Sequence, residues 1–416
     1  MSQSQQQRAH DVVLYGATGF TGRQSARYFR EHAPNQLRWA IAGRNVEKLR
    51  QLHASLELGS QVAILVADSA DQPALDAIAA SCHVLLTTAG PFARYGDGVV
   101  RACVTHGTHY VDITGETAWV RRMIDTWHDQ AAAQGTRIVP FCGFDSIPSD
   151  LGVWMMAQWF RAQGHGEVKN VRASFKLGGG GLNGGTLASG LHAGESGDQA
   201  TLGDVLLLNP THRRTSAEAK RSRDWRVVEF DDTLQTYLTP FVMAPVNTRV
   251  VRRSNALLAD DAQPYGESFT YTECMETSRR GAAYGTLYAM GALQGLLTRK
   301  TGRALLRRFG PAPGAGPTEE QMDRGWFRLR LVAEAEDGTR ALGVVTGQGD
   351  AGNRSTVRML CESAITLAVA GDALPGGVGA GGVLTPATGI GAPLLKRLRA
   401  TAEMTWEVSP LEDRLV

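Results

Sequence analysis

The sequence predicts an α/β fold in which a doubly wound parallel sheet is joined to a second, mainly antiparallel α+β domain. Short apolar stretches alternate with helix-like stretches over the first third of the chain, which is typical of strands linked by helical crossovers. A glycine motif directly after the first apolar stretch predicts a strand-to-helix turn. In the second half, alternating apolar and charged residues with turn signals predict antiparallel strands. The length of 416 residues suits two or three domains.

The strands of the parallel sheet are short apolar runs, as expected when both faces of a sheet are covered. They are expected over residues 12–15, 38–42, 62–66, 84–88, 110–113 and 137–141. Helices are expected from the glycine motif to about residue 32, and over residues 45–52, 75–80, 99–104 and 119–133. In the helix over 45–52 the apolar residues recur three apart, and Asn45 is a suitable N-cap.

The second half contains a different pattern. Strands are expected over residues 168–177, 268–274, 326–335 and 342–345. Asp337 and Gly338 predict the turn between the last two strands. Residues 355–370 are predicted to form a long helix that ends at Gly371. These features favour a mainly antiparallel sheet with one covered face.

Composition excludes several classes of function. The 43 Lys and Arg residues balance 41 Asp and Glu residues, so no strong positive field favours nucleic acid as a partner. The five Cys residues form no C-x-x-C pair, which argues against a disulfide framework and a zinc ribbon. His106 and His109 have no third ligand at a suitable spacing, so no metal site is expected. The polar N-terminus resembles no signal peptide, and a cytoplasmic location is expected.

One apolar stretch, residues 281–297, is rich in Gly and Ala and too short to cross a bilayer. It predicts either a buried or groove-lining helix, or a helix that lies on a membrane surface. The buried or groove-lining helix is the first expectation, and the membrane-surface helix is kept as an alternative because of the cations that follow the stretch, which are Arg299, Lys300, Arg303, Arg307 and Arg308. Peripheral membrane or lipid contact through residues 281–308 is therefore left open, and the oligomeric state is not indicated by the sequence.

The glycine motif G-x-x-G-x-x-G predicts a dinucleotide site. It follows the first strand and opens a helix, so its backbone can approach a pyrophosphate and offer free N–H groups at the helix N-terminus. The threonines within it can add hydroxyl donors. This context predicts a Rossmann-like domain whose phosphate-binding residues are Gly16, Thr18, Gly19, Phe20, Thr21 and Gly22.

The end of the second strand selects the dinucleotide. NAD binding expects an acidic residue there, whereas this chain has Arg44, followed by Lys48 one turn later. A guanidinium can grip a 2′-phosphate through paired charge-assisted hydrogen bonds, so NADP(H) is favoured over NAD(H). The alternative is that Arg44 is only a solvated loop residue. Asp68, after the third strand, is placed to approach the adenine amino group or to cap the next helix.

The turn after the fourth strand is expected to lie under the cofactor ribose and nicotinamide. It is small and rich in hydrogen-bonding groups, so the ring can lie flat against it. Its residues are Thr88, Ala89, Gly90 and Pro91.

Several motifs together resemble the saccharopine-dehydrogenase-like oxidoreductases. They are GATGFTG, AGR, TTAGPFARYG, GTHYVDITGE, FCGFDSIPSDLG and, near the C-terminus, GGVLTPATGIGAPLLKRL. The chain is most similar to the branch that includes trans-acting enoyl reductases of lipid biosynthesis. The resemblance implies an NADP(H)-binding domain over residues 8–148, an inserted α+β substrate domain over 149–353, and a segment over 354–416 that returns to the first domain. It does not imply saccharopine as the substrate.

Hydride transfer needs a positioned nicotinamide and groups that stabilise charge and move a proton on the substrate. Tyr95, Glu116 and Asp145 follow strand ends, where such folds bind ligands, and are the candidate catalytic residues. Asp145 and Ser146 can alternatively cap the next helix, with Pro148 in its first turn. The favoured function is an NADP(H)-dependent oxidoreductase of an apolar, lipid-derived substrate, with enoyl-reductase-like reduction of a C=C bond. Two alternatives remain open. One is a dehydrogenase of a small amino-acid adduct, and the other is a non-catalytic NADP(H)- or lipid-associated binding protein.

Overall fold

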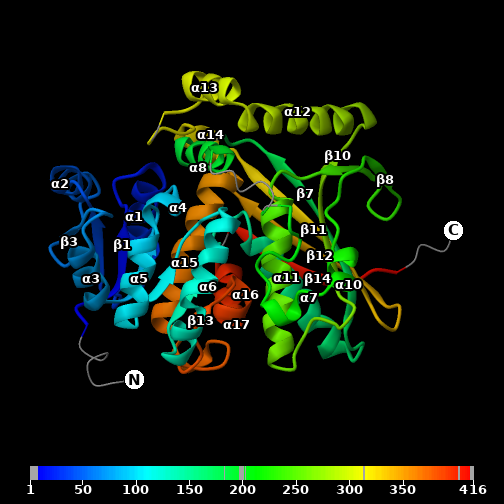
Figure 1. Cartoon of the computed structure of the whole chain (residues 1–416), viewed down its shortest axis with the longest axis horizontal. Helices are drawn as coiled ribbons and strands as arrows, with labels where there is room; N and C mark the ends of the chain where they lie inside the picture. The colour runs from blue at the N-terminus through cyan, green and yellow to red at the C-terminus, as the bar shows by residue number, and fades with distance from the viewer. Residues whose placement is uncertain are drawn as a thin grey trace.

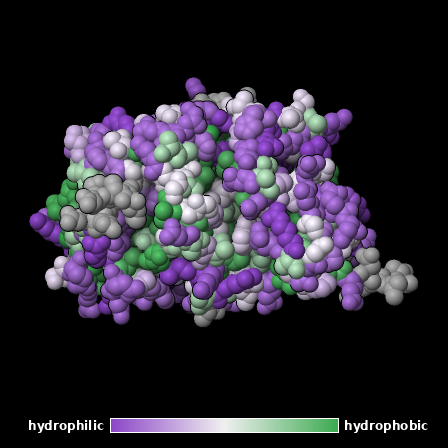
Figure 2. Space-filling model, turned by 90° about the horizontal axis from the view of Figure 1, so that it is seen from below, coloured by the Kyte–Doolittle hydropathy of each residue, from purple (hydrophilic) through white to green (hydrophobic). Residues whose placement is uncertain are grey.

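The computed structural model describes residues 8–412 except 182, 196–200, 202, 313 and 402. It contains two seven-stranded sheets that lie side by side, with long helices between and around them (Figure 1). Seen from below, hydrophilic residues predominate around the rim of the molecule, and hydrophobic residues occur in small groups between them (Figure 2).

The first sheet is parallel throughout, as predicted, with the order β13-β6-β5-β4-β1-β2-β3. Its strands are β1 (His10–Tyr15), β2 (Trp39–Gly43), β3 (Ala63–Val66), β4 (Cys82–Thr87), β5 (His109–Val111), β6 (Arg137–Val139) and β13 (Gly382–Val383). The order in which strands are added reverses at β1: β2 and β3 extend the sheet on one side, and β4 pairs with β1 on the other side, parallel to it. Ligands bind at this point in such sheets.

Helices cover both faces of the parallel sheet and bury two apolar clusters, one on each side. The helices of this part are α1 (Phe20–His32), α2 (Val46–Ser55), α3 (Gln72–Ser81), α4 (Phe92–Tyr95), α5 (Asp97–His106), α6 (Thr117–Ala133) and α15 (Thr356–Val369). Asn45 caps α2, as predicted, by accepting a hydrogen bond from the Lys48 N–H (2.9 Å).

The predicted strand over 137–141 is two residues too long. Pro140 has no N–H to continue the ladder, and Phe141 adopts a positive φ of 67°, which turns the chain away from the sheet. The Phe141 N–H donates instead to the Asp112 carboxylate (3.2 Å). The strand therefore ends at Val139, and the following residues form a loop at the ligand-binding edge.

The second sheet is antiparallel except for one pair, and its order is β14-β12-β11-β7-β10-β9-β8. The exception is that β7 and β10 run parallel. The strands are β7 (Val168–Gly178), β8 (Glu229–Asp231), β9 (Thr236–Pro240), β10 (Thr270–Thr277), β11 (Trp326–Ala335), β12 (Arg340–Gln348) and β14 (Met404–Pro410). The C-terminal stretch contributes to both sheets, because β13 pairs with β6 and β14 pairs with β12.

The remaining helices join the two sheets or lie against the second one. They are α7 (Ile147–Gln163), α8 (Gly184–Glu195), α10 (Ser216–Arg221), α11 (Ala244–Asp260), α12 (Arg280–Thr298), α13 (Lys300–Phe309), α14 (Glu319–Asp323), α16 (Pro386–Gly389) and α17 (Gly391–Ala400), with a π-helical turn over Ala351–Ser355. None of the helices in the described part is long and apolar enough to span a bilayer.

A buried carboxylate joins three of these helices. Asp150 of α7 accepts hydrogen bonds from the Ser254 hydroxyl of α11 and from the Ala387 N–H of α16 (2.8 Å). Burial raises the pKa of Asp150 to about 7. The group therefore keeps its proton in the folded chain at pH values where it loses it in the unfolded chain.

We expect the contribution of Asp150 to the free energy of unfolding to fall as pH rises from the ordinary carboxyl range to about 7. Over that window Asp150 is protonated in the folded chain and ionised in the unfolded chain, so its titration favours unfolding. Asp150→Asn removes one such group, and its stability should depend less on pH, by up to about 1.4 kcal/mol per unit. Urea unfolding at several pH values measures both slopes. Asp372→Asn, at an exposed position, is the control, and equal slopes for Asp150→Asn and wild type would contradict the assignment.

Candidate functional site

The turn between β1 and α1 is shaped by its first glycine. Gly16 has a φ of 84°, a conformation that glycine adopts without steric cost. The N–H groups of Gly16 and Ala17 both donate to the Ala42 carbonyl (2.9 and 3.1 Å), and the Gly19 N–H donates back to the Gly16 carbonyl (3.0 Å). These bonds fix a tight turn at the carboxyl end of β1.

The beginning of α1 is open to a ligand. Gly19 is the N-cap and provides no side-chain cap. The N–H groups of Phe20, Thr21 and Gly22 have no acceptor among the residues that the structure describes, and most of the turn is half-exposed. Free N–H groups and the positive end of the helix dipole are suited to a pyrophosphate. The turn therefore fits the diphosphate of a dinucleotide.

A segment of the second domain lies over this turn. The Phe20 ring packs so closely on Gly316 that an added Cβ there would lie 2.4 Å from it. Arg23 donates to the Thr18 carbonyl (2.9 Å) and to the Gly314 carbonyl (3.3 Å). The start of α1 is therefore bordered by the segment that contains Gly314 and Gly316.

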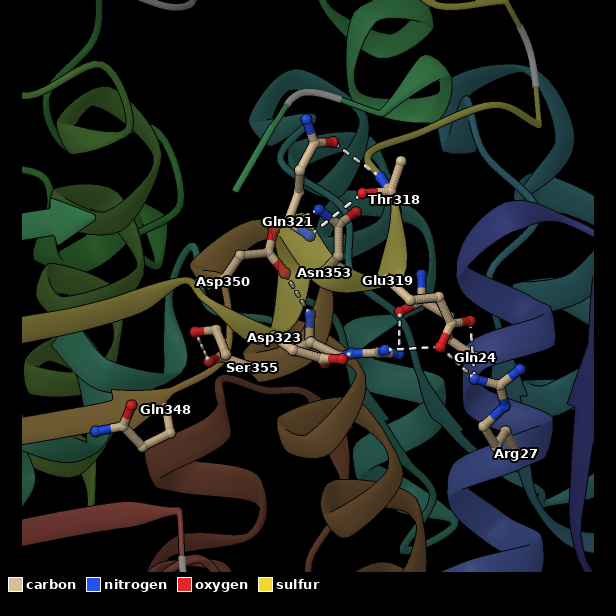
Figure 3. Close-up of polar contacts among 12 residues, drawn as sticks. Gln24, Arg27, Thr318, Glu319, Gln321, Asp323, Gln348, Asp350, Asn353 and Ser355 are labelled. Atoms are coloured by element: carbon tan, nitrogen blue, oxygen red, sulfur yellow. Dashed lines mark hydrogen bonds and ion pairs between the residues drawn. The ribbon is translucent and has the colours of Figure 1, made fainter. Parts of the chain in front are cut away.

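Ion pairs hold α14, which follows this segment, against α1 (Figure 3). Glu319 accepts from Arg27 of α1 (2.7 Å) and from Arg354 (3.0 Å). Arg354 also pairs with Asp323 (2.8 Å) and donates to the Gln24 side chain (3.2 Å). A cavity of about 260 Å³ lies between α1, α2 and α14. This network ties the second domain to the cofactor-binding helix.

The predicted adenosine end lies at the ends of β2 and β3. Arg44 and Lys48 are exposed, and neither forms an ion pair with a described residue. Burial raises the Tyr15 pKa to about 12, to which the Asp68 charge adds and the Arg44 charge is opposed. Asp68 accepts from the Ala70 N–H (3.0 Å) and does not cap α3. The cap of α3 is Asp71, so the capping alternative for Asp68 is wrong.

The turn after β4 contacts the glycine turn. The Thr88 hydroxyl donates to the Gly16 carbonyl (3.1 Å). An added Cβ at Gly16 would lie 3.0 Å from the Thr88 hydroxyl oxygen and from the Ala89 nitrogen. Gly90 and Pro91 complete the turn and are half-exposed. The two predicted halves of the cofactor site are thus neighbours at the switch point between β1 and β4.

Glu116 holds this turn in place. Its two carboxylate oxygens accept from the N–H groups of Phe92 and Ala93, at the start of α4, at 2.9 Å each. The Ser189 hydroxyl of α8 donates to the same carboxylate (2.9 Å). A carboxylate at a helix N-terminus is stabilised by the helix dipole. Glu116 is therefore placed to position the turn and to connect it with the second domain.

The other two catalytic candidates have unpaired functional groups. The Tyr95 hydroxyl and the Asp145 carboxyl make no hydrogen bond with any described residue, and both side chains are half-buried. The Arg94 guanidinium lies 5.2 Å from the Tyr95 ring centre. Burial raises the Asp145 pKa to about 6. Ser146 is the N-cap residue of α7 and Pro148 lies in its first turn, as the alternative expects, but the Ser146 hydroxyl donates to Asn247 (3.1 Å) and makes no side-chain cap hydrogen bond.

The five cysteines are free and buried. In the described part of the chain, no three His, Cys, Asp or Glu side chains are grouped as metal ligands.

Comparisons with known proteins agree with this geometry. Residues 12–139 match the family model described as the saccharopine dehydrogenase NADP-binding domain. A putative trans-acting enoyl reductase from Mycobacterium tuberculosis is 37% identical over 413 residues, which cover 94% of this chain and 96% of the relative. A trans-acting enoyl reductase from Mycobacterium bovis is 36% identical over the same shares of both chains.

The fold has a counterpart among solved structures. Apo saccharopine dehydrogenase (L-Glu forming) from Saccharomyces cerevisiae aligns with a TM-score of 0.53 and 14% identity, over 97% of this chain and 100% of that chain. This likeness concerns the fold alone. The family is established by the NADP-binding domain and by the 36–37% identity with the mycobacterial relatives over nearly the whole length. The chain belongs to the saccharopine-dehydrogenase-like oxidoreductases, in the branch of the trans-acting enoyl reductases, and is an NADP(H)-dependent oxidoreductase.

Proposed function

We propose that the protein uses NADPH to reduce a carbon–carbon double bond conjugated to a carbonyl group in an apolar, lipid-derived substrate. The observation that carries the proposal is the 36–37% identity with trans-acting enoyl reductases, which extends through both domains. The helix α8, whose Ser189 donates to Glu116 beside the predicted nicotinamide turn, supports an apolar substrate. From Gly184 to Leu191, α8 has no charged side chain, whereas a dicarboxylic amino-acid substrate would require cations.

When bound, NADPH supplies the hydride for the β-carbon of the substrate. The α1 amides would hold its diphosphate, and Arg44 its 2′-phosphate. The Tyr95 hydroxyl would donate to the carbonyl oxygen as negative charge develops there. The raised pKa of Asp145 keeps a fraction of its carboxyl protonated near pH 6, so it can deliver a proton to the α-carbon. Glu116 would position the turn that carries the nicotinamide.

Two further features belong to the proposal. The domains are assigned as residues 8–148 for the cofactor, 149–353 for the substrate and 354–416 for the returning segment. Peripheral contact with lipid through residues 281–308 would give the enzyme access to an apolar substrate.

The reaction is tested by following NADPH absorbance with trans-2-enoyl thioesters of increasing chain length. We expect oxidation that depends on the double bond and becomes more efficient, in kcat/KM, as the chain lengthens. If NADPH binds but no enoyl thioester is reduced, the proposal is wrong. Reduction of an imine formed from an amino acid and a keto acid would then identify the amino-acid-adduct dehydrogenase instead.

Glu116→Gln separates positioning from cofactor binding. The amide NH₂ group of Gln would face a backbone N–H of α4, which leaves one donor unsatisfied at a cost of about 1–3 kcal/mol. We expect kcat to fall tenfold or more, while the Kd of NADPH changes by less than about threefold. Ser189→Ala, which removes only one of the three hydrogen bonds, should have a smaller effect. An unchanged kcat in Glu116→Gln would exclude the positioning role.

A further inference from the structure

We infer that α12 and α13 form a docking surface for an anionic phospholipid bilayer. This α12–α13 surface, residues 280–309, lies along one edge of the molecule, above α8 and α14 (Figure 1). The inference deepens the lipid contact proposed above. It does not require that the reduced bond be an enoyl bond.

The α12 helix is apolar but exposed. It contains no charged residue from 281 to 298, and Ala283 is its one buried residue. Tyr288 is 72% exposed and Leu293 39% exposed. A Cβ added at Gly281, Gly285, Gly291 or Gly295 would meet no atom within 4 Å. Exposing the apolar side chains of α12 to water costs free energy, and an exposed apolar surface of this kind is typical of an interaction site.

Cations surround this apolar face. Residues 277–318 contain no Asp or Glu and hold seven cations, Arg279, Arg280, Arg299, Lys300, Arg303, Arg307 and Arg308. Arg303 and Arg307 pair with Glu195. The other five form no ion pair with any described residue. Phe309, which is 74% exposed, and Leu305, 50% exposed, lie among the cations of α13.

The corner between the two helices is preformed. Gly302 approaches α12 so closely that an added Cβ would lie 2.3 Å from the Leu296 carbonyl oxygen. The buried Arg303 donates to the carbonyls of Leu297 and Thr298 at the end of α12 (3.0 Å each) and to the Gly194 carbonyl of α8 (3.1 Å). A guanidinium on the last carbonyls of a helix is favourable. The surface therefore needs little ordering when it binds.

Charge complementarity decides the occupant. An apolar helix flanked by cations, five of which have no carboxylate partner among the described residues, matches an anionic interface, where the apolar side chains enter the acyl boundary and the cations meet phosphate groups. A second copy of this surface would bring cations against cations. The opposite side of the molecule, seen in Figure 2, is predominantly hydrophilic at its rim, with hydrophobic residues in small groups between. Through Arg303, α8 and Ser189, the surface is also connected to Glu116 and the nicotinamide-bearing turn.

Co-sedimentation of the full chain with vesicles tests the inference. We expect binding to vesicles of phosphatidylcholine with phosphatidylglycerol, at least tenfold weaker binding to phosphatidylcholine alone, and weaker binding as salt is added. Lys300→Glu with Arg308→Glu should reduce binding at least tenfold, and Tyr288→Ser with Phe309→Ser should do the same. Arg122→Glu with Lys220→Glu makes the same charge change at exposed positions elsewhere and should have little effect.

Each other outcome overturns the inference. Equal binding to both vesicle types excludes a role for the cations, and no binding excludes the bilayer. Concentration-dependent dimerisation that the Tyr288→Ser and Phe309→Ser variant abolishes would assign the surface to a second copy. If the chain binds both vesicle types alike, and an added acidic protein displaces it from them, the α12–α13 surface is a docking site for an acidic protein and not for the bilayer. Reduction of a soluble short-chain enoyl thioester, measured without vesicles, reports separately on the proposed reaction, so the two failures are distinguishable.

Discussion

Gly22→Ala is expected to destabilise the fold and to abolish NADPH binding. An added Cβ would lie 2.2 Å from the Gly16 carbonyl oxygen and 2.8 Å from two Ala17 backbone atoms. These atoms belong to the tight turn that Ala42 holds, so they cannot move without breaking its hydrogen bonds. Overpacking of this kind costs about 1–3 kcal/mol or more. Thermal unfolding should show a lower Tm, and titration should show at least hundredfold weaker NADPH binding.

Gly19→Ala is the matched control, because it adds the same methyl group to the same motif. Its added Cβ would lie 3.3 Å from the Gly16 carbonyl oxygen, and its φ of −70° suits alanine. We expect an unchanged Tm and NADPH binding that is at least tenfold weaker, since the methyl group would stand where a diphosphate approaches. Normal NADPH binding by Gly19→Ala would exclude the diphosphate from this turn. An unchanged Tm in Gly22→Ala would exclude close helix–turn packing as the role of Gly22.

Arg44→Asp is expected to remove the preference for NADPH over NADH. Arg44 follows the end of β2, is exposed, and has no ion-pair partner in the described part of the chain, so its guanidinium is available to a 2′-phosphate. An aspartate there would repel the phosphate and could accept hydrogen bonds from the ribose hydroxyls of NADH. The ratio of the two Kd values should change by tenfold or more, equivalent to about 1.4 kcal/mol.

Arg101→Asp, at an exposed position on α5, makes the same charge change away from the site. It should leave the ratio of Kd values unchanged, which separates local recognition from the net charge of the protein. If Arg44→Asp keeps the wild-type ratio, Arg44 is the solvated loop residue of the alternative interpretation.

Local sequence predicted the strand–turn–helix unit at the start of the parallel sheet, because its determinants are close together in the chain. The glycine turn, the start of α1 and the Asn45 cap depend on residues within a few positions of each other. The parallel sheet followed from apolar runs separated by helix-length segments. Strand ends were less predictable: β6 ends at Val139 because Pro140 and the positive φ of Phe141 act together.

The contacts that enclose the site could not be predicted from local patterns. Ser189 meets Glu116 across 73 positions, and Arg23 meets Gly314 across 291. Both contacts depend on how the second domain folds over the first, for which neither spacing nor periodicity carries a signal. The same reason explains the parallel pairing of β7 with β10, whose connection runs through α11 and two strands.

We propose that this chain, which has an NADP-binding domain, binds NADP(H) at the β1–α1 turn and selects it by its 2′-phosphate. Calorimetric titration of the wild-type protein with NADPH and with NADH tests this claim most directly. We predict that NADPH binds at one site and at least tenfold more tightly than NADH. Equal affinity, tighter binding of NADH, or binding of neither dinucleotide would contradict it.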